Sequence, residues 1–266
     1  MKGLALALLA ALLTSISAIG GPIEIGFGAG PAATSLEEIN ASITVFNAVI
    51  EHLNETFAAH PNVSGVVGPI APMGSGLSVS ASERYWITDW LALGAQVEYV
   101  RSSTSVLGQY QGTESGVSTL DIALGMSAVG FTVGGRVTFL DMGLRLAGEA
   151  SAGYYYATFN RSVVFEIPSE YPDALAGVPP EGAGRYTGGT FGFEVGLSLS
   201  YPVTSWFTMG SFLSYRSAGI PVLTDLQQVK LDLDGDGNAD AVNLDGIVVQ
   251  LTFSLAIDLS PDGRKE

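Results

Sequence analysis

The chain has 266 residues, a formal net charge of −15, no cysteine and two histidines. Only 14% of its residues are charged, whereas a soluble globular domain usually carries about 25%. Twenty-six acidic residues against eleven basic ones argue against a nucleic-acid-binding protein. Hydrophobic residues make up 47% of the chain, and the absence of cysteine suits an exported protein, in which free thiols would form disulfides.

The N-terminal segment has the composition of an export signal. Lys2 precedes the apolar run Leu4–Leu13, and the small residues Ser17 and Ala18 follow it. This order predicts a secretory signal peptide over residues 1–18. The run is too short to span a bilayer, and no later stretch approaches the roughly 20 consecutive apolar residues of a spanning helix.

One amphipathic helix is predicted, at residues 35–60, after a first strand at residues 23–29. Its apolar residues recur at steps of three and four, which is the pattern of one helix face. They are Leu36, Ile39, Ile43, Phe46, Ile50, Leu53 and Phe57. Ser35 and Glu38 have the spacing of a capping box, and Pro61 ends the pattern. The apolar stripe either packs on the rest of the chain or binds a protein partner or a second copy.

The last strand, residues 247–259, shows the clearest alternation in the chain. Every odd position from Ile247 to Leu259 is a large apolar residue, and the even positions are smaller or polar apart from Val248. A period of two over 13 residues predicts a strand that is longer than usual in a soluble sheet. Similar segments predict six more strands, at residues 77–87, 90–100, 117–139, 144–166, 191–201 and 206–216.

Two irregular regions are predicted between and within these strands. The polar residues 102–116 are expected to form a loop. In the strand 117–139, the apolar residues change from even to odd positions across Ser127–Gly130, which predicts a β-bulge there.

The eight strands predict an all-β fold: an eight-stranded antiparallel transmembrane β-barrel over residues 22–259, with the helix in its first extracellular loop. An even, closed ring leaves no unpaired edge, as lipid requires. Short turns alternate with long connections, such as the acidic loop 217–245, and aromatic residues surround the turn at Thr88. This asymmetry, which places both termini in the periplasm, resembles the small outer-membrane β-barrel family of the OmpA, OmpX and OmpW type. The polar tail 260–266 departs from that family, whose barrels usually end on an aromatic residue; Phe253 is a possible internal substitute.

Outward apolar faces imply a polar lumen. The residues expected inside are Glu24, Arg84, Gln96, Glu98, Asp121, Arg136, Arg145, Glu149, Glu194, Arg216 and Asp258. An eight-stranded ring holds little beyond its own side chains, so these charges must pair. The set is either a structural ion-pair network or a narrow ion path.

The acidic loop contains a calcium-type motif. Asp232, Asp234, Asp236 and Asp240 occupy its first, third, fifth and ninth positions, with Asn238 at the seventh. Alternate residues of a tight loop can direct their oxygens toward one hard cation, and Gly237 at the sixth position permits the turn. The string resembles the calcium loops of EF-hands, dockerins and thrombospondin-type repeats. It departs at the twelfth position, where Asn243 replaces the bidentate acid and Asp245 is a possible substitute.

These patterns favour an outer-membrane protein with a structural or surface-binding role, and the alternatives are a small channel for ions or apolar solutes and a soluble secreted β-sandwich. The expected partners are bilayer lipids, including those of the outer leaflet, and divalent cations such as Ca²⁺. His52 and His60 have no Ser or Asp neighbour in a catalytic arrangement, so no enzyme activity is expected.

Overall fold

A computed structural model describes residues 22–113, 116–165 and 182–258. The predicted signal peptide, residues 166–181 and the tail 260–266 lie outside these ranges. Eight long strands form the barrel: β1 (Pro22–Ala33), β3 (Ser75–Trp86), β4 (Leu91–Gly112), β5 (Gly116–Asp141), β6 (Arg145–Phe165), β7 (Gly182–Pro202), β8 (Phe207–Ser217) and β11 (Gly246–Asp258).

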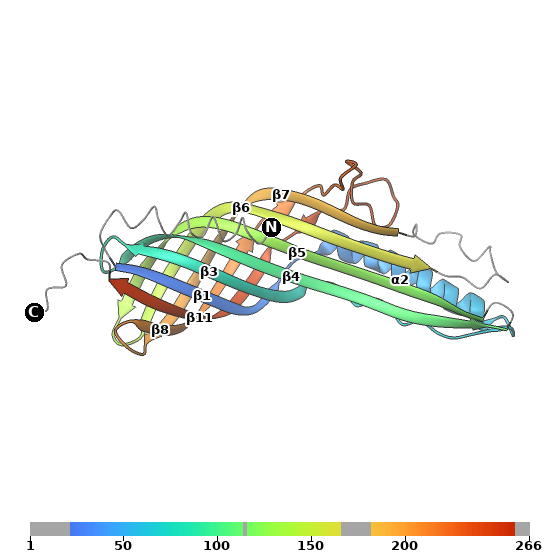
Figure 1. Ribbon diagram of the computed structural model, residues 1–266, viewed down its shortest axis with the longest axis horizontal. Coiled ribbons are helices and arrows are strands. Elements are labelled where there is room, and N and C mark those ends of the chain that lie inside the picture. The colour runs from blue at the N-terminus through green and yellow to red at the C-terminus, as the bar shows by residue number, and fades with distance from the viewer. Residues whose placement is uncertain (1–21, 114–115, 166–181, 259–266) are drawn as a thin grey trace, which may run out of the picture.

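The ring of strands is closed. The long strands pair antiparallel in the order β1-β3-β4-β5-β6-β7-β8-β11, and β11 returns to β1 with Phe27 opposite Phe253. Closure leaves no edge in the barrel wall, so the predicted eight-stranded antiparallel barrel is confirmed, and a two-sheet sandwich is not what the chain forms. Figure 1 shows the barrel at one end of an elongated molecule.

The short turns lie at one end of the barrel, as predicted. In two of them a threonine hydroxyl accepts a hydrogen bond from the first residue of the next strand. Leu91 N donates to Thr88 Oγ1 and Phe207 N donates to Thr204 Oγ1, each at 3.0 Å. The third turn uses Gly143, whose φ of +82° favours glycine.

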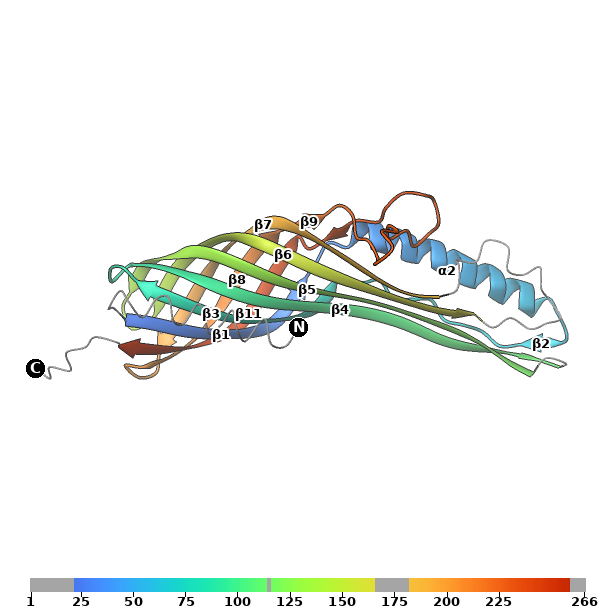
Figure 2. The ribbon, with the colours of Figure 1, turned by 45° about the horizontal axis from the view of Figure 1, so that its top comes forward.

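Four strands continue far beyond the barrel at the opposite end. We call residues 102–112 of β4, 116–128 of β5, 156–165 of β6 and 182–190 of β7 the projecting sheet. Figures 1 and 2 show it as a curved sheet with the helix α2 (Glu37–Ala58) along it. The predicted loop 102–116 is wrong: Gly112 pairs with Gly116, and β4 stays in register with β5 down to Leu91. Its Ser, Thr and Gln residues are polar because this part of the strand has one face in water.

The predicted β-bulge at Ser127–Gly130 is also wrong. β5 pairs with β6 without a shift from Leu120 to Thr138, and the irregularity lies between Thr138 and Leu140. Even-numbered residues of β5 face inward from Ser118 to Arg136, ahead of this irregularity. They are buried at Leu120–Met126 in the projecting sheet, whereas the outward Phe131 and Val133 of the barrel are exposed. The apolar residues change sides because the surroundings of the strand change, not because the strand twists over.

The helix α2 buries its whole predicted stripe against the inner face of the projecting sheet. All seven residues from Leu36 to Phe57 are at most 3% exposed and share one core with residues of β4, β5 and β6. Of the two readings of the stripe, packing on the chain itself is the one observed. The capping box is wrong: the N-cap is Leu36 without a side-chain hydrogen bond, and Glu38 instead accepts one from Ala241 N. No helix in the described ranges has the length and apolarity needed to cross a bilayer.

The acidic loop completes this core from the other side. Within residues 218–245, the short strands β9 (Gly219–Ile220) and β10 (Val242–Asn243) pair with each other. Six apolar side chains of the loop are fully buried and belong to the core of α2; they are Ile220, Leu223, Leu231, Leu233, Val242 and Leu244. The loop is therefore folded onto the helix rather than free.

Three asparagines bind the segment between β2 (Val63–Ser64) and β3 to the helix. Asn40, Asn47 and Asn54 each accept from a backbone N–H and donate to the C=O of the same residue, at 2.6–3.0 Å. The residues held are Met73, Ile70 and Val67. Seven helical residues rise about 10.5 Å, and three extended residues advance about 9–10 Å, so the two spacings match along the antiparallel pair.

Replacing the middle asparagine tests this ladder. In Asn47→Ala, the Ile70 N–H and C=O lose their partners in a half-buried site, which should cost about 1–3 kcal/mol of local stability. Hydrogen exchange at the Ile70 amide should speed up, while Glu51→Ala on the exposed helix face should leave it unchanged. Equal exchange in both variants would show that the asparagine does not hold the segment.

Candidate functional site

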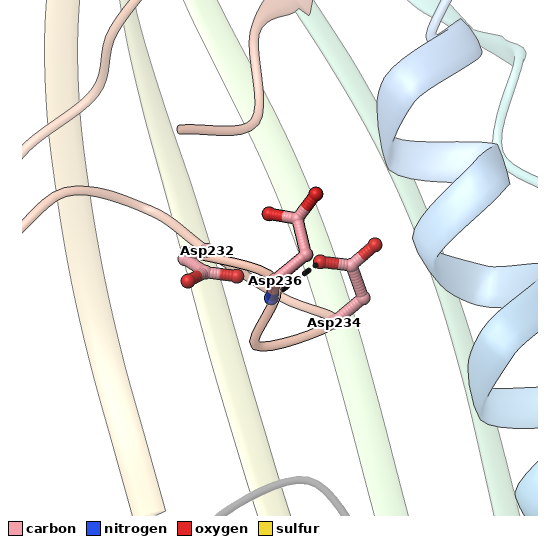
Figure 3. Close-up of side chains that lie close together, drawn as sticks. All are labelled: Asp232, Asp234 and Asp236. Atoms are coloured by element: carbon pink, nitrogen blue, oxygen red, sulfur yellow. Dashed lines mark hydrogen bonds between the residues drawn. The ribbon is translucent and has the colours of Figure 1, made fainter. Parts of the chain in front are cut away.

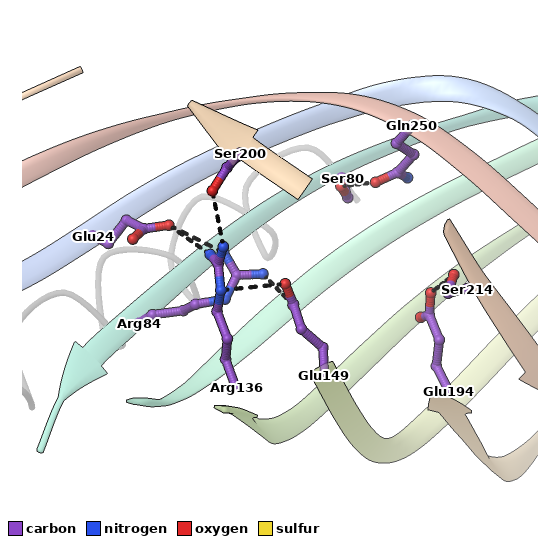
Figure 4. A network of polar contacts seen from close by, with 9 residues as sticks. All are labelled: Glu24, Ser80, Arg84, Arg136, Glu149, Glu194, Ser200, Ser214 and Gln250. Carbon is purple, nitrogen blue, oxygen red and sulfur yellow. Dashed lines mark hydrogen bonds and ion pairs between the residues drawn. The ribbon is translucent and has the colours of Figure 1, made fainter. Parts of the chain in front are cut away.

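Two layers of charged residues cross the barrel lumen. The lower layer, near the short turns, joins Arg84 and Arg136 to Glu24 and Glu149 (Figure 4). Arg84 lies 2.7 Å from Glu149 and 3.5 Å from Glu24, and Arg136 lies 3.2 Å from Glu24. The four residues come from β3, β5, β1 and β6, so their network ties opposite walls together. Two cations and two anions make the layer neutral.

The upper layer is built around Arg216, which is 0% exposed. Its Nη1 donates to Glu98 at 2.6 Å and its Nε donates to the Leu244 carbonyl at 3.0 Å. Its guanidinium lies 5.8 Å from the ring centre of Tyr155, which belongs to the core of α2. Arg216 therefore connects the barrel wall to the acidic loop and to the apolar core above the lumen.

Neutral side chains complete this layer. Ser78 Oγ donates to Glu98 at 2.6 Å and accepts from Gln250 Nε2 at 2.7 Å, and Ser214 donates to Glu194. Figure 4 shows the Glu194–Ser214 pair at some distance along the lumen from the arginine pair of the lower layer. These neutral partners were not singled out from the sequence, although their even positions in the alternation place Ser78, Ser214 and Gln250 on the inward face.

Most of the predicted inward residues are confirmed, and two are corrected. Asp121 faces outward on the projecting sheet, because its neighbours across the ladder, Leu107 and Val164, are both exposed on the outer face. Arg145 lies at the rim, where it pairs with Asp141 at 2.9 Å. Gln96 lines both small cavities of the lumen. The side chain of Asp258 lies outside the described part of the structure.

The widest part of the lumen is its mouth at the end with the short turns, and the cavities farther inside are small. That mouth is a vestibule of about 700 Å³, lined by residues such as Trp86, Asp89 and Arg145. Two cavities of about 30 Å³ flank the lower charged layer, which is room for one or two waters each. At the other end lies the apolar core of α2, with Tyr155 1% exposed. The described residues thus form a polar well that is open at one end and closed at the other.

The calcium-type loop brings three of its six predicted ligands together. Carboxylate oxygens of Asp232, Asp234 and Asp236 lie within 4.8 Å of one another, as Figure 3 shows. Asp232 accepts from the N–H groups of Gly235 and Gly237, at 2.7 and 3.0 Å. Both glycines have positive φ, which the tight turn requires.

The other three predicted ligands make different contacts. Asn238 donates to Asp236 at 2.8 Å, and this hydrogen bond lowers the pKa of the Asp236 carboxyl. Asp240 accepts from Leu233 N at 2.5 Å and from Ser42 Oγ of α2 at 2.8 Å, and burial raises its pKa. Asn243 accepts from Asp245 N at 2.9 Å. Asp245 itself accepts from Ala218 N at 2.6 Å rather than joining the three carboxylates.

The two histidines lie on or next to α2. His52 is on the exposed face of the helix, and His60 follows its C-terminal end, with its backbone N–H donating to Phe57 O at 3.1 Å. The expectation that the protein is not an enzyme stays a prediction.

Comparison with known proteins gives matches to solved structures alone: no protein-family model and no curated protein sequence matches the chain. The outer membrane protein OprG from Pseudomonas aeruginosa is 13% identical, with 90% of this chain and 96% of OprG covered and a TM-score of 0.35. The attachment invasion locus protein Ail of Yersinia pestis is 11% identical, with 90% and 100% covered and a TM-score of 0.38. The outer membrane protease OmpT from Escherichia coli is 12% identical, with 75% and 68% covered and a TM-score of 0.35.

All three are bacterial proteins, and OprG and OmpT are named as outer-membrane proteins. Because the identities and TM-scores are low, these likenesses carry no activity or ligand over to this chain. The assignment of the fold rests on the chain's own closed strand ladder: it is a small β-barrel with a projecting sheet.

Proposed function

We propose that the chain is an exported outer-membrane barrel that anchors the projecting sheet, α2 and the acidic loop at the bacterial surface. The observation that carries this proposal is the outer wall of the barrel. Its outward side chains, such as Leu197, Leu213, Leu251 and Val133, are large, apolar and 51–68% exposed, so water would solvate a continuous apolar band. Lipid hydrocarbon around the barrel removes the free-energy cost of exposing these apolar side chains to water.

Aromatic residues limit this apolar band at both ends. On β5, Phe131 and Phe139 are eight positions apart, and on β7, Phe191 and Tyr201 are ten positions apart; all four are exposed. A tilted strand needs about 9–11 residues to cross a bilayer, so the spacing fits. Beyond the upper limit most outward residues are polar or small, as at Ser127, Ser105 and Asn160, and the exposed apolar residues Leu107, Val117 and Val164 are scattered among them. The projecting sheet would then stand in water outside the membrane.

A charge on the outer face of β5 tests the placement. Val133→Arg puts a cation in the apolar band and should cost about 2–4 kcal/mol, with less heat-modifiable, folded barrel recovered from membranes. Ser127→Arg adds the same charge on the same face of the same strand, six residues nearer the projecting end, and should fold normally. If both variants assemble equally well, the band does not face hydrocarbon.

A channel is the second candidate function, and the lumen argues against it. Ion pairs cross the barrel in two layers, and the apolar core of α2 covers the projecting end. An ion entering from the vestibule would have to displace paired charges and then cross an apolar layer. The polar well therefore supports a structural network better than an ion path.

Conductance measurements separate these two functions. The purified protein should show no steady conductance in planar bilayers. Glu149→Ser opens the lower layer but leaves the apolar core in place, so this variant should also be silent. Steady single-channel currents from the unmodified protein would favour the channel.

We further propose that the acidic loop binds calcium through Asp232, Asp234 and Asp236. The convergence of three carboxylates supports this, because hard cations prefer several oxygen ligands and three like charges repel each other without a cation. Asp240 and Asn243 are engaged elsewhere, so backbone carbonyls or waters would complete the shell. The few protein ligands predict weak binding, at about 10⁻⁴–10⁻³ M. A bound divalent cation could bridge to anionic groups of the cell surface.

Calorimetry tests the calcium proposal. The unmodified protein should take up calcium, and Asp234→Ala and Asp236→Ala should abolish the uptake because each removes one of three carboxylates. Asp121→Ala removes an acid from the outer face of the projecting sheet and should have no effect. Unchanged uptake in the two loop variants would eliminate the site.

A further inference from the structure

One stretch of the projecting sheet has an open edge. β2 pairs with Gln111 and Gly112 of β4, and β3 pairs with β4 up to Arg101. Between these pairings, Ser103–Gly108 has β5 on one side and no backbone hydrogen-bond partner on the other among the described residues. Peptide groups alternate in direction along a strand, so about half of the N–H and C=O groups in this stretch point into the opening.

The segment that connects β2 to β3 does not fill this opening. The residues between β2 and β3 include Pro69 and Pro72, which have no N–H to donate to a ladder. The asparagine ladder instead draws the segment toward α2. Val67 lies so close beneath Gly108 that a Cβ on Gly108 would be 2.2 Å from Val67 Cγ2. The segment therefore passes under β4 and leaves its edge uncovered.

The edge lacks the features that keep sheet edges from pairing. Proteins protect open edges with charges, prolines or bulges. From Ser102 to Thr113 the chain has no charged residue and no proline, and the β4–β5 register is continuous. Exposed apolar residues lie at the margins of the opening: Leu107 is 68% exposed on the outer face, and Val66 is 77% exposed on the segment beneath.

We propose that Ser103–Gly108 binds an extended, uncharged peptide segment of a partner protein, which inserts as a strand between β2 and β3. Unpaired groups at strand spacing can be matched only by extended backbone, which identifies the class of ligand. The opening is six residues long, or about 20 Å. Apolar side chains at alternate positions of the peptide would meet Val66 and the prolines beneath.

A second copy of the chain does not suit this edge. Symmetric pairing of two identical edges requires the two β4 strands to run in opposite directions. Copies anchored in one membrane, as proposed above, project the same way, so their β4 strands cannot pair with each other in that manner. This step alone rests on the proposed membrane placement.

Hydrogen exchange on the full chain in detergent tests the proposal. The probe is the blocked hexapeptide acetyl-Thr-Val-Thr-Val-Thr-Val-amide. The peptide should slow hydrogen exchange at the amides of residues 103–108 that point into the opening by at least about tenfold, equivalent to about 1.4 kcal/mol. Exchange at residues 94–100 should stay unchanged. The same peptide N-methylated at every residue has no N–H to donate on either edge, so it cannot form the ladder and should give no protection.

Charge variants provide a matched control. Ser105→Lys places a charge at the edge and should weaken peptide binding at least about tenfold. Asn160→Lys adds the same charge to the outer face of β6 and should leave binding unchanged. The proposal is overturned if the hexapeptide gives no protection up to millimolar concentration, or if the methylated peptide protects equally. Protection that rises with protein concentration without peptide would assign the edge to a second copy and also overturn it.

Discussion

The structure depends on a change of surroundings along single strands. In the barrel, the strands keep polar side chains inside and apolar ones outside. In the projecting sheet, the same strands bury apolar side chains on the inner face and present mostly polar ones to water. β5 passes through this change without losing register, between Met126 on the inner face and Phe131 on the outer face. Hydrogen bonding of the backbone is independent of side-chain polarity, so one ladder can serve both parts.

This change makes α2 necessary. The inner face of the projecting sheet is apolar, and the ring does not continue far enough to enclose it. The helix and the acidic loop cover that face with one shared core, and the same core closes the barrel lumen. Arg216 joins the two parts, because it pairs with Glu98 in the barrel and also binds the Leu244 carbonyl of the loop. The polar well and the apolar core are therefore packed on each other rather than separate units.

The functional residues follow from these layers. Charges in a narrow ring must pair, and the lower layer does so across four strands. The acidic loop stays at the surface, where three aspartates converge and Asp240 turns inward to hold Ser42 of the helix. The asparagine ladder draws the segment after β2 away from the sheet edge, so that Ser103–Gly108 of β4 has no described strand on the side opposite β5.

The sequence by itself determined the eight strands, their short turns, the helix with its buried face and most of the inward charges, because period-2 and period-3.6 patterns report directly which side chains share a face. Tertiary structure decided how far the strands extend and which face of each strand contacts water. The polar stretch 102–112 resembles a loop until its partner strand is known, and the change of parity at Ser127 resembles a bulge until α2 is placed over it. Alternation shows that two faces differ, but only the surrounding elements show which medium each face meets. For the same reason, alternation alone predicts Asp121 on the inside. The different contacts of Asp234, Asp240 and Asn243 within one motif depend on α2 and on the fold of the loop, which the spacing of the motif does not encode.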